Sequence, residues 1–218
     1  MIPGYRAPTL TGDGVVGGET LGAGYRFVSM PLGERAAGRG GVYWVATAAG
    51  APRPEPPATQ LALLRRWFAH WHAPVGALLA ATEPEDLVPQ EVRELRPLPR
   101  AYGFCSGPGG VVLLGDAAHA MPHHLAQGAC LALEDVATLQ AVLANVRGPL
   151  TPALDEFSRL RRARVTRVLQ QTRKASAVLQ SRGGLTSRAM GAALGRANPR
   201  TLDKAAATAA EWSGPTSA

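Results

Sequence analysis

Residues suited to chemistry are concentrated between Val111 and Asp135 of this 218-residue sequence. The apolar run 111–114 predicts a short buried strand of the kind found in layered α/β domains, and Gly115 and Asp116 follow it directly. Ligands of open α/β sheets bind beyond the carboxyl ends of their strands. A carboxylate at that place accepts hydrogen bonds from sugar or ribityl hydroxyls and repels phosphate, so Asp116 is expected to bind hydroxyl groups.

A predicted helix start at Gln127, Gly128 and Ala129 is the second feature. The first N–H groups of a helix lack intrahelical partners and lie at the positive end of its dipole, so they favour an anion or an electron-rich carbonyl. Gly128 has no Cβ and lets a flat ligand approach the backbone closely. Pro122 stiffens the connecting loop. These residues predict a ligand site at the junction of strand and helix.

The other polar residues of this stretch fit structural roles better than chemical ones. His119, His123 and His124 match no common zinc spacing, so we expect one packed histidine and two loop histidines without a metal. No Gly-x-Ser-x-Gly elbow is present, which argues against a Ser-His-Asp hydrolase. Glu134 and Asp135 are expected to be solvated or to form a local ion pair. No residue is assigned a catalytic role.

Before the motif, the pattern predicts part of an antiparallel sheet with a helical layer. Period-two alternation and helical spacing predict strands over 25–30, 42–47 and 91–98 and helices over 60–73 and 75–82. The first two strands are expected to pair as an antiparallel hairpin across a long glycine-rich loop. Pro74 is expected to end the first helix.

Three helices are predicted, one that begins within the motif and two after it, so together with the sheet the fold class is mixed α/β (α+β). The first begins near Gln127, and its buried side is expected to hold Leu131, Val136, Leu139, Val142 and Leu143. The second is long, begins with Thr151 as N-cap and Pro152 at the first helical position, and ends at Gly183-Gly184. A weaker helix over 185–194 follows.

Composition indicates a globular protein. Apolar residues make up 46% of the chain and charged residues 18%, which is enough apolar material for a core. Two cysteines do not form a disulfide framework in a chain this long, and they favour a reducing, cytoplasmic setting. We expect no signal peptide and no membrane span, because no apolar run approaches the roughly 18 residues that cross a bilayer.

The net charge of +7 is placed unevenly. Residues 1–150 hold 11 Lys or Arg and 12 Asp or Glu, whereas residues 151–204 hold 12 and 3, for a net +9. A basic segment attracts nucleic acid and other anions, but Arg159–Arg167 has no interleaved aromatic residues and no nucleic-acid module is recognisable. We expect a solvated basic helix face and no nucleic-acid partner. A basic binding module over 151–204 is a weaker alternative.

The residues of the motif form a pattern that resembles the second FAD-binding motif of class A flavoprotein monooxygenases, the family of para-hydroxybenzoate and salicylate hydroxylases. The matching residues are Gly115 to His119, Pro122, Gln127-Gly128 and Glu134-Asp135. Weaker likenesses flank the motif, at Pro97 to Arg100 and in the basic run Arg159 to Arg164. The resemblance spans residues 20–200.

The resemblance implies FAD as cofactor, NADH or NADPH as electron donor, and hydroxylation of an aromatic or related small molecule with O2. It places Asp116 on the ribityl chain and Pro122 near the flavin ring and the substrate. The helix start at Gln127, Gly128 and Ala129 faces the pyrimidine edge of the flavin in the family. Gly115, which precedes Asp116, belongs to the same cofactor-binding set.

Three departures from the family stand out. No Gly-x-Gly-x-x-Gly follows a strand and the family's Asp-Gly motif is absent, so we expect the chain to lack the N-terminal dinucleotide-binding half. Ala126 stands where the family usually has Gly, and His123 where it often has Pro. The expected partners are therefore a small-molecule substrate and either the missing N-terminal half or further copies of this chain. The alternative is a catalytically inactive, degenerate homologue that acts through a protein partner.

The predicted domain organisation follows from these assignments. It consists of part of a substrate-domain sheet with the helix 60–73 in residues 1–100, the C-terminal part of an FAD-binding domain in 101–150, basic helices in 151–200 and a flexible tail in 201–218.

Overall fold

A computed structural model of the chain describes residues 2–3, 17–32, 41–50, 55–107, 109–144, 146–196, 198, 200, 207 and 211–214. Most of the tail predicted for 201–218 lies outside these residues. The chain divides into two compact units. Unit 1 comprises Met1–Glu91 with Leu179–Ala189, and unit 2 comprises Val92–Val178 with Met190–Ala218.

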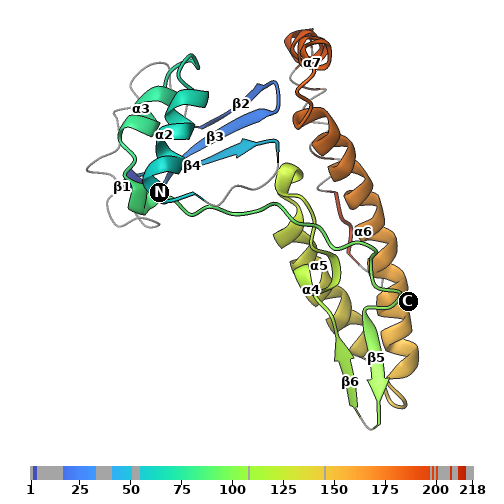
Figure 1. Ribbon diagram of the computed structural model, residues 1–218. Coiled ribbons are helices and arrows are strands. Elements are labelled where there is room, and N and C mark those ends of the chain that lie inside the picture. The colour runs from blue at the N-terminus through green and yellow to red at the C-terminus, as the bar shows by residue number, and fades with distance from the viewer. Residues whose placement is uncertain are drawn as a thin grey trace. The chain divides into compact units, whose positions relative to one another are not determined.

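Unit 1 contains a four-stranded antiparallel sheet (Figure 1). Its strands, in spatial order, are β1 (Ile2–Pro3), β4 (Gly41–Ala48), β3 (Tyr25–Leu32) and β2 (Gly18–Gly22). The predicted strands over 25–30 and 42–47 are confirmed as β3 and β4, and they pair antiparallel with Phe27 opposite Ala46. Residues 33–40 of the connection between them lie outside the described residues.

Two helices, α2 (Pro57–Trp67) and α3 (Val75–Ala80), pack on one face of this sheet, and the short 3-10 turn η1 (Pro84–Asp86) follows. The core between the layers holds Phe27 and Val42 from the strands and Phe68, Val75, Leu78 and Leu79 from the helical layer. Aromatic contacts fix this core, since the Phe27 ring stacks on Trp44 with centroids 5.3 Å apart. Large buried aromatic side chains of this kind dominate the energetics of small cores.

The helix predicted over 60–73 is shorter than expected and lies earlier, because it ends at Trp67. The N–H of Phe68 still donates to the Leu64 carbonyl, but the next residues form turns in which the Trp71 N–H donates to Phe68. Trp71 then packs edge-on against Phe68, with centroids 4.6 Å apart. Trp71 thus reaches the core from a turn, although its spacing imitates a helix. Pro74 does not end α2; it stands at the N-cap of α3.

Unit 2 begins with an extended segment and a β-hairpin. The hairpin pairs β5 (Gly103–Ser106) with β6 (Gly109–Val112), and Gly103 lies opposite Val112. The remaining elements are α4 (Asp116–His119), the 3-10 turn η2 (His123–Leu125), α5 (Gly128–Leu143) and α6 (Thr151–Leu179). A further helix, α7 (Gly184–Arg196), follows, and its residues up to Ala189 belong to unit 1. The predicted break between the two helices is present, but α6 already ends at Leu179 and Gly184 begins α7. The core cluster of unit 2 holds Tyr102, Ala118, Leu131, Phe157, Val165 and Val168.

Two strand predictions in unit 2 are wrong. Segment 91–98 forms no strand; it is extended and held by the Leu95 N–H on the Ala120 carbonyl, so its hydrogen bond goes to a loop. The run 111–114 is not a buried strand, because β6 ends at Val112 and Val111 is 58% exposed in an antiparallel hairpin. Its last three residues, Val112, Leu113 and Leu114, are partly buried and pack against the core.

The buried side of α5 agrees only in part with the predicted one: Leu131 is buried, and Leu139 and Val142 pack against the core, whereas Val136 and Leu143 are exposed. Its buried residues are Leu131, Glu134, Asp135 and Thr138. Val136, predicted to be buried, is 53% exposed, and Leu133 is 72% exposed. A helix turns polar residues inward only when they find partners there, and α6 supplies these partners.

The Tyr102 hydroxyl lies in the core of unit 2 without a hydrogen-bond partner in the described part of the chain. Burial raises the pKa of Tyr102 to about 12. An unsatisfied buried hydroxyl costs about 1–3 kcal/mol. We therefore expect Tyr102→Phe to leave the free energy of unfolding unchanged or to raise it by up to about 1 kcal/mol.

Denaturant unfolding of Tyr102→Phe and Tyr102→Leu measures this effect. The leucine variant also removes ring packing and should be destabilised by about 1–3 kcal/mol. A loss of more than about 1 kcal/mol in the phenylalanine variant would show that the hydroxyl has a partner.

Candidate functional site

The turn between β6 and α4 is formed by Gly115 in a backbone conformation that favours glycine. Its φ of 55° and ψ of −136° lie outside the regions open to residues with a Cβ. Asp116, the first residue of α4, follows it and its side chain is exposed. The turn therefore presents a carboxylate to solvent just after the hairpin, and not after the buried strand expected from the sequence.

The start of α5 is the second predicted part of the site. Gln127 stands at the N-cap and Gly128 is the first helical residue, as predicted. The Leu131 N–H donates to the Gln127 carbonyl, so the N–H groups of residues 128–130 precede the first intrahelical bond. A Cβ built on Gly128 would meet no heavy atom of the described residues within 4 Å. Free N–H groups and open space therefore adjoin at this end of α5.

The loop between α4 and α5 contains Pro122 at the N-cap of η2 and ends at Ala126. Ala126 has φ 52° and ψ 29°, which is the left-handed conformation. This geometry explains why glycine suits the position, since a Cβ is disfavoured there. His123 is exposed, whereas His124 is buried.

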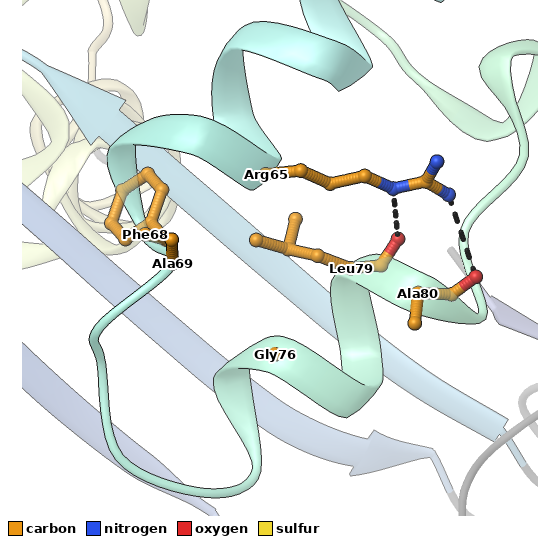
Figure 2. Close-up of a pocket in the computed structure, with 6 residues that line it drawn as sticks. All are labelled: Arg65, Phe68, Ala69, Gly76, Leu79 and Ala80. Atoms are coloured by element: carbon orange, nitrogen blue, oxygen red, sulfur yellow. Dashed lines mark hydrogen bonds between the residues drawn. The ribbon is translucent and has the colours of Figure 1, made fainter.

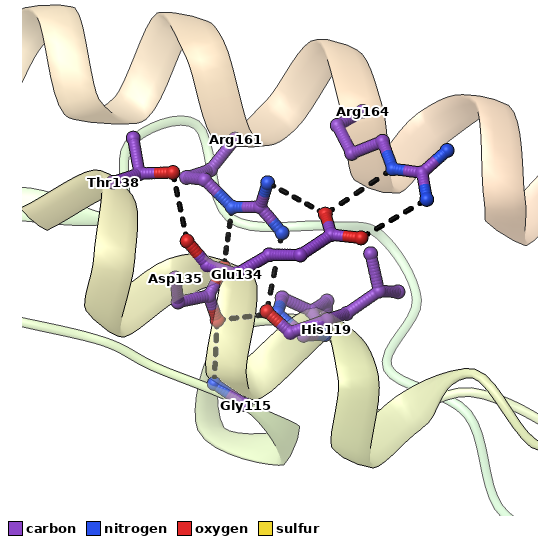
Figure 3. Close-up of polar contacts among 8 residues, drawn as sticks. Gly115, His119, Glu134, Asp135, Thr138, Arg161 and Arg164 are labelled. Atoms are coloured by element: carbon purple, nitrogen blue, oxygen red, sulfur yellow. Dashed lines mark hydrogen bonds and ion pairs between the residues drawn. The ribbon is translucent and has the colours of Figure 1, made fainter. Parts of the chain in front are cut away.

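Asp135 of α5 is the centre of a buried polar network (Figure 3). One carboxylate oxygen, Oδ2, accepts the Gly115 N–H at 2.9 Å and His119 Nε2 at 2.7 Å. The other, Oδ1, accepts Arg161 Nε at 2.6 Å. The carboxylate thus joins the Gly115 turn, the end of α4 and helix α6.

Glu134, the neighbour of Asp135, continues the network toward α6. It accepts Arg161 Nη1 at 2.9 Å and both Nε and Nη2 of Arg164, at 3.2 and 3.0 Å. Arg161 also donates to the Leu131 carbonyl at 3.1 Å and is only 1% exposed. Two buried carboxylates therefore face two buried guanidinium groups, and the charges balance.

This network corrects two expectations and shows what the sequence pattern missed. Glu134 and Asp135 form ion pairs but are neither solvated nor local, since their arginine partners lie 26 to 30 residues away. Arg161 and Arg164 do not belong to a solvated basic face, because they are buried. His119 is packed as expected, at 0% exposure. The sequence did contain a sign of these ion pairs: two adjacent acids on α5, and two arginines three residues apart, on one side of α6.

Asp135 makes the stability of the chain acid-sensitive. Burial by itself would raise the pKa of Asp135, but hydrogen bonds from His119, Gly115 and Arg161 outweigh it and lower the pKa below its ordinary value. The unfolded chain therefore takes up this proton at a higher pH than the folded chain does. The stabilisation is complete above about pH 5 and is lost as the pH falls below about 4.

Denaturant unfolding between about pH 6 and 3 measures this effect, whose slope for one proton is at most about 1.4 kcal/mol per pH unit. Asp135→Asn should flatten the acid limb of stability. Asp155→Asn, which changes an exposed carboxylate in the first turns of α6, should keep it. Equal slopes for the wild type and Asp135→Asn would contradict the prediction.

A separate hollow of about 340 Å³ lies in unit 1 between α2 and α3 (Figure 2). Its lining is mostly apolar, with Phe68, Leu79 and Ala80 among its residues. The single charged residue of the lining is Arg65, which donates to the carbonyls of Leu79 and Thr82, both at 3.1 Å. Arg65 therefore caps the end of α3, and the hollow contains none of the predicted site residues.

No group of three His, Cys, Asp or Glu residues with a geometry for metal binding occurs in the described ranges. Among the same residues, none of the helices combines the length and the apolar character needed to cross a membrane.

Comparison with known proteins relates the chain to flavoproteins. Residues 69–172 match the family model described as an FAD binding domain. The aurachin C monooxygenase/isomerase of Stigmatella aurantiaca is 34% identical over 145 residues, which are 66% of this chain and 34% of the relative. The FAD-dependent urate hydroxylase of Klebsiella pneumoniae subsp. pneumoniae is 36% identical over 111 residues, 51% of this chain and 27% of the relative.

Solved structures agree with these relatives. Klebsiella pneumoniae HpxO complexed with FAD and uric acid superposes with a TM-score of 0.76 at 26% identity, over 89% of this chain and 47% of that chain. A salicylate hydroxylase substrate complex shares the fold, with a TM-score of 0.58 at 22% identity, over 93% of this chain and 50% of that chain. The chain spans about a third or less of these curated relatives and about half of the solved chains.

Proposed function

We propose that this chain, which belongs to the family of class A FAD-dependent aromatic hydroxylases, binds the ribityl and ring portion of FAD in unit 2. Asp116 would accept hydrogen bonds from the ribityl hydroxyls. The N–H groups that open α5, at Gln127, Gly128 and Ala129, would face the pyrimidine edge of the flavin. Pro122 would lie beside the ring, and Gly115 shapes the turn that carries Asp116.

The residues present fit such a ligand. Asp116 is exposed at the beginning of α4, and an ionised carboxylate accepts hydrogen bonds from hydroxyls without offering a donor of its own. The open space at Gly128 admits a flat ring against the backbone, where any larger residue would place a Cβ. The positive end of the 16-residue helix α5 favours an electron-rich carbonyl or a negative charge on the ring. This pairing of a carboxylate with a glycine-led helix start carries the proposal.

We further propose that the protein hydroxylates an aromatic or related small molecule with NADH or NADPH and O2. FAD would supply the redox chemistry, and the protein would bind and orient it and keep water away. The relatives, which include monooxygenases and hydroxylases, support this activity and do not favour an inactive homologue. The exposed thiols Cys105 and Cys130 form no disulfide, which supports the proposal of a reducing, cytoplasmic setting.

The domain roles are part of the same proposal. The antiparallel sheet of unit 1 would belong to a substrate domain, and residues 101–150 would form the C-terminal part of an FAD-binding domain. The sequence has no Gly-x-Gly-x-x-Gly turn after a strand. We propose that an N-terminal half with that turn completes the cofactor site; association with further copies of the chain, which lack the turn as well, is the alternative partner.

A competition experiment on the purified chain tests the flavin site. The visible spectrum of added FAD is recorded with and without the chain. Riboflavin, ADP and ribose are then offered as competitors, and the FAD that stays bound after desalting is quantified by chromatography, which separates FAD from riboflavin. Riboflavin carries the ribityl and ring portion and should displace FAD, whereas ADP and ribose should not. Displacement by ADP but not by riboflavin, or no change in the FAD spectrum at millimolar chain, would overturn the assignment.

A further inference from the structure

We propose that Asp135 is a positioning residue that fixes the Gly115 turn, and with it the Asp116 carboxylate, relative to the start of α5. The inference rests on the proposed flavin site and adds to it a residue that does not touch the ligand.

The hydrogen bonds of Asp135 converge on the segment that presents Asp116. Its Oδ2 accepts the N–H of Gly115, the residue directly before Asp116, at 2.9 Å. The same oxygen accepts Nε2 of His119, the last residue of α4, at 2.7 Å. One carboxylate oxygen therefore holds both ends of the short helix that begins with Asp116.

Asp135 also belongs to α5, the helix whose N-terminal N–H groups form the other half of the site. Seven residues separate it from Gly128, which is about two helical turns or roughly 10 Å along a rigid rod. The distance between the Asp116 carboxylate and the free N–H groups of α5 is thus set through Asp135. A ligand that contacts both groups needs this distance to be fixed.

An aspartate is suited to this position because all of its neighbours donate. The Gly115 N–H, His119 Nε2 and Arg161 Nε approach its two oxygens, and an ionised carboxylate only accepts. Asparagine would direct two N–H donors into this set and leave at least one donor without a partner. The contact also defines the tautomer of His119, which carries a proton on Nε2. Its Nδ1 is buried and has no partner among the described residues.

Arg161 anchors the arrangement from α6. Its Nε donates to Asp135 Oδ1 at 2.6 Å, while its other nitrogens donate to Glu134 and to the Leu131 carbonyl. A carboxylate held on one side by a buried guanidinium has little freedom to rotate away from Gly115. The two neighbouring acids therefore differ in role: both bind Arg161, but only Asp135 contacts Gly115 and His119.

The difference between the two acids provides a matched test. In the full chain, amide hydrogen exchange of Gly115 is compared among the wild type, Asp135→Asn and Glu134→Gln, and riboflavin affinity is measured for each by its visible spectrum. Asp135→Asn should exchange Gly115 at least tenfold faster and bind riboflavin at least tenfold more weakly. Glu134→Gln, which perturbs the same network, should keep Gly115 protection within about threefold of the wild type.

The wild type alone keeps the inference testable if Asp135→Asn fails to fold. Its nitrogen chemical shifts should show His119 protonated at Nε2, and its Gly115 amide should be strongly protected from exchange. A Gly115 amide that exchanges freely in the wild type, or is equally protected in wild type and Asp135→Asn, would overturn the positioning role. If Gly115 responds as expected but the wild type does not bind riboflavin, the positioning of the turn stands and the flavin proposal fails.

Discussion

Replacing Arg161 with alanine should destabilise the chain by about 3–5 kcal/mol, the cost of breaking a buried ion pair from one side. The guanidinium is 1% exposed and is bonded to Asp135, Glu134 and the Leu131 carbonyl. Its removal leaves Asp135 without a cation and Glu134 with Arg164 alone. The whole free energy of unfolding of a domain is only about 5–15 kcal/mol. The variant should therefore unfold at a much lower urea concentration than the wild type or show no cooperative transition.

Arg159→Ala is the matched control for this prediction. Arg159 lies on the same helix, is exposed and pairs with Glu156 one turn earlier. Exposed pairs of this kind contribute little to stability, so this variant should unfold close to the wild type in urea. Similar unfolding midpoints for the Arg161 and Arg159 variants would contradict the description of Arg161 as a buried anchor.

The network around Arg161 also shows why the sequence predicts α5 correctly as a helix but only part of its buried side. The sequence of α5 has apolar residues on all sides of the helix, so their spacing alone does not show which side is buried. The buried stripe includes Glu134, Asp135 and Thr138, because charged partners on α6 satisfy the two acids. Pairing between residues about 30 positions apart is not contained in a local pattern.

Local signals succeeded where the cause of the structure is itself local. The hairpin of β3 and β4 follows from the alternation of apolar residues, and α5 begins near Gln127 as the helical spacing after that residue predicts. The strand expected over 91–98 failed because its sequence permits an extended chain, whereas a strand also needs a partner. The prediction that Trp71 belongs to a helix was wrong for a related reason. A turn brings its side chain to the core, although its spacing in the sequence is typical of a helix.

The candidate site also combines features that a local sequence pattern indicates with one that depends on distant residues. Gly115, Asp116 and Gly128 are proposed from the sequence because turns and helix starts require particular residues at fixed positions. The contribution of Asp135 was missed because its partners come from three segments, at Gly115, His119 and Arg161. A local pattern therefore suffices to propose ligand contacts, whereas the positioning role proposed for Asp135 emerges only from the structure.

Replacing Asp116 with alanine should weaken flavin binding with little change in folding. A hydrogen bond to a charged group contributes about 1.5–3 kcal/mol, so riboflavin affinity should fall by about 10- to 150-fold. Asp116 is exposed, and exposed substitutions usually change stability by less than about 0.5 kcal/mol. Spectral titration with riboflavin measures the affinity, and urea unfolding measures the stability of the same sample.

Two further variants separate the hydrogen bond from the charge. Asp116→Asn keeps one carbonyl acceptor at the same place and should lose less affinity than Asp116→Ala. Asp155→Ala removes the same charge from an exposed position at the start of α6 and should bind riboflavin like the wild type. If Asp116→Ala and Asp155→Ala both bind riboflavin as tightly as the wild type, Asp116 makes no contact with the ligand. An equal loss in both would mean that net charge, and not a hydrogen bond at the Gly115 turn, governs binding.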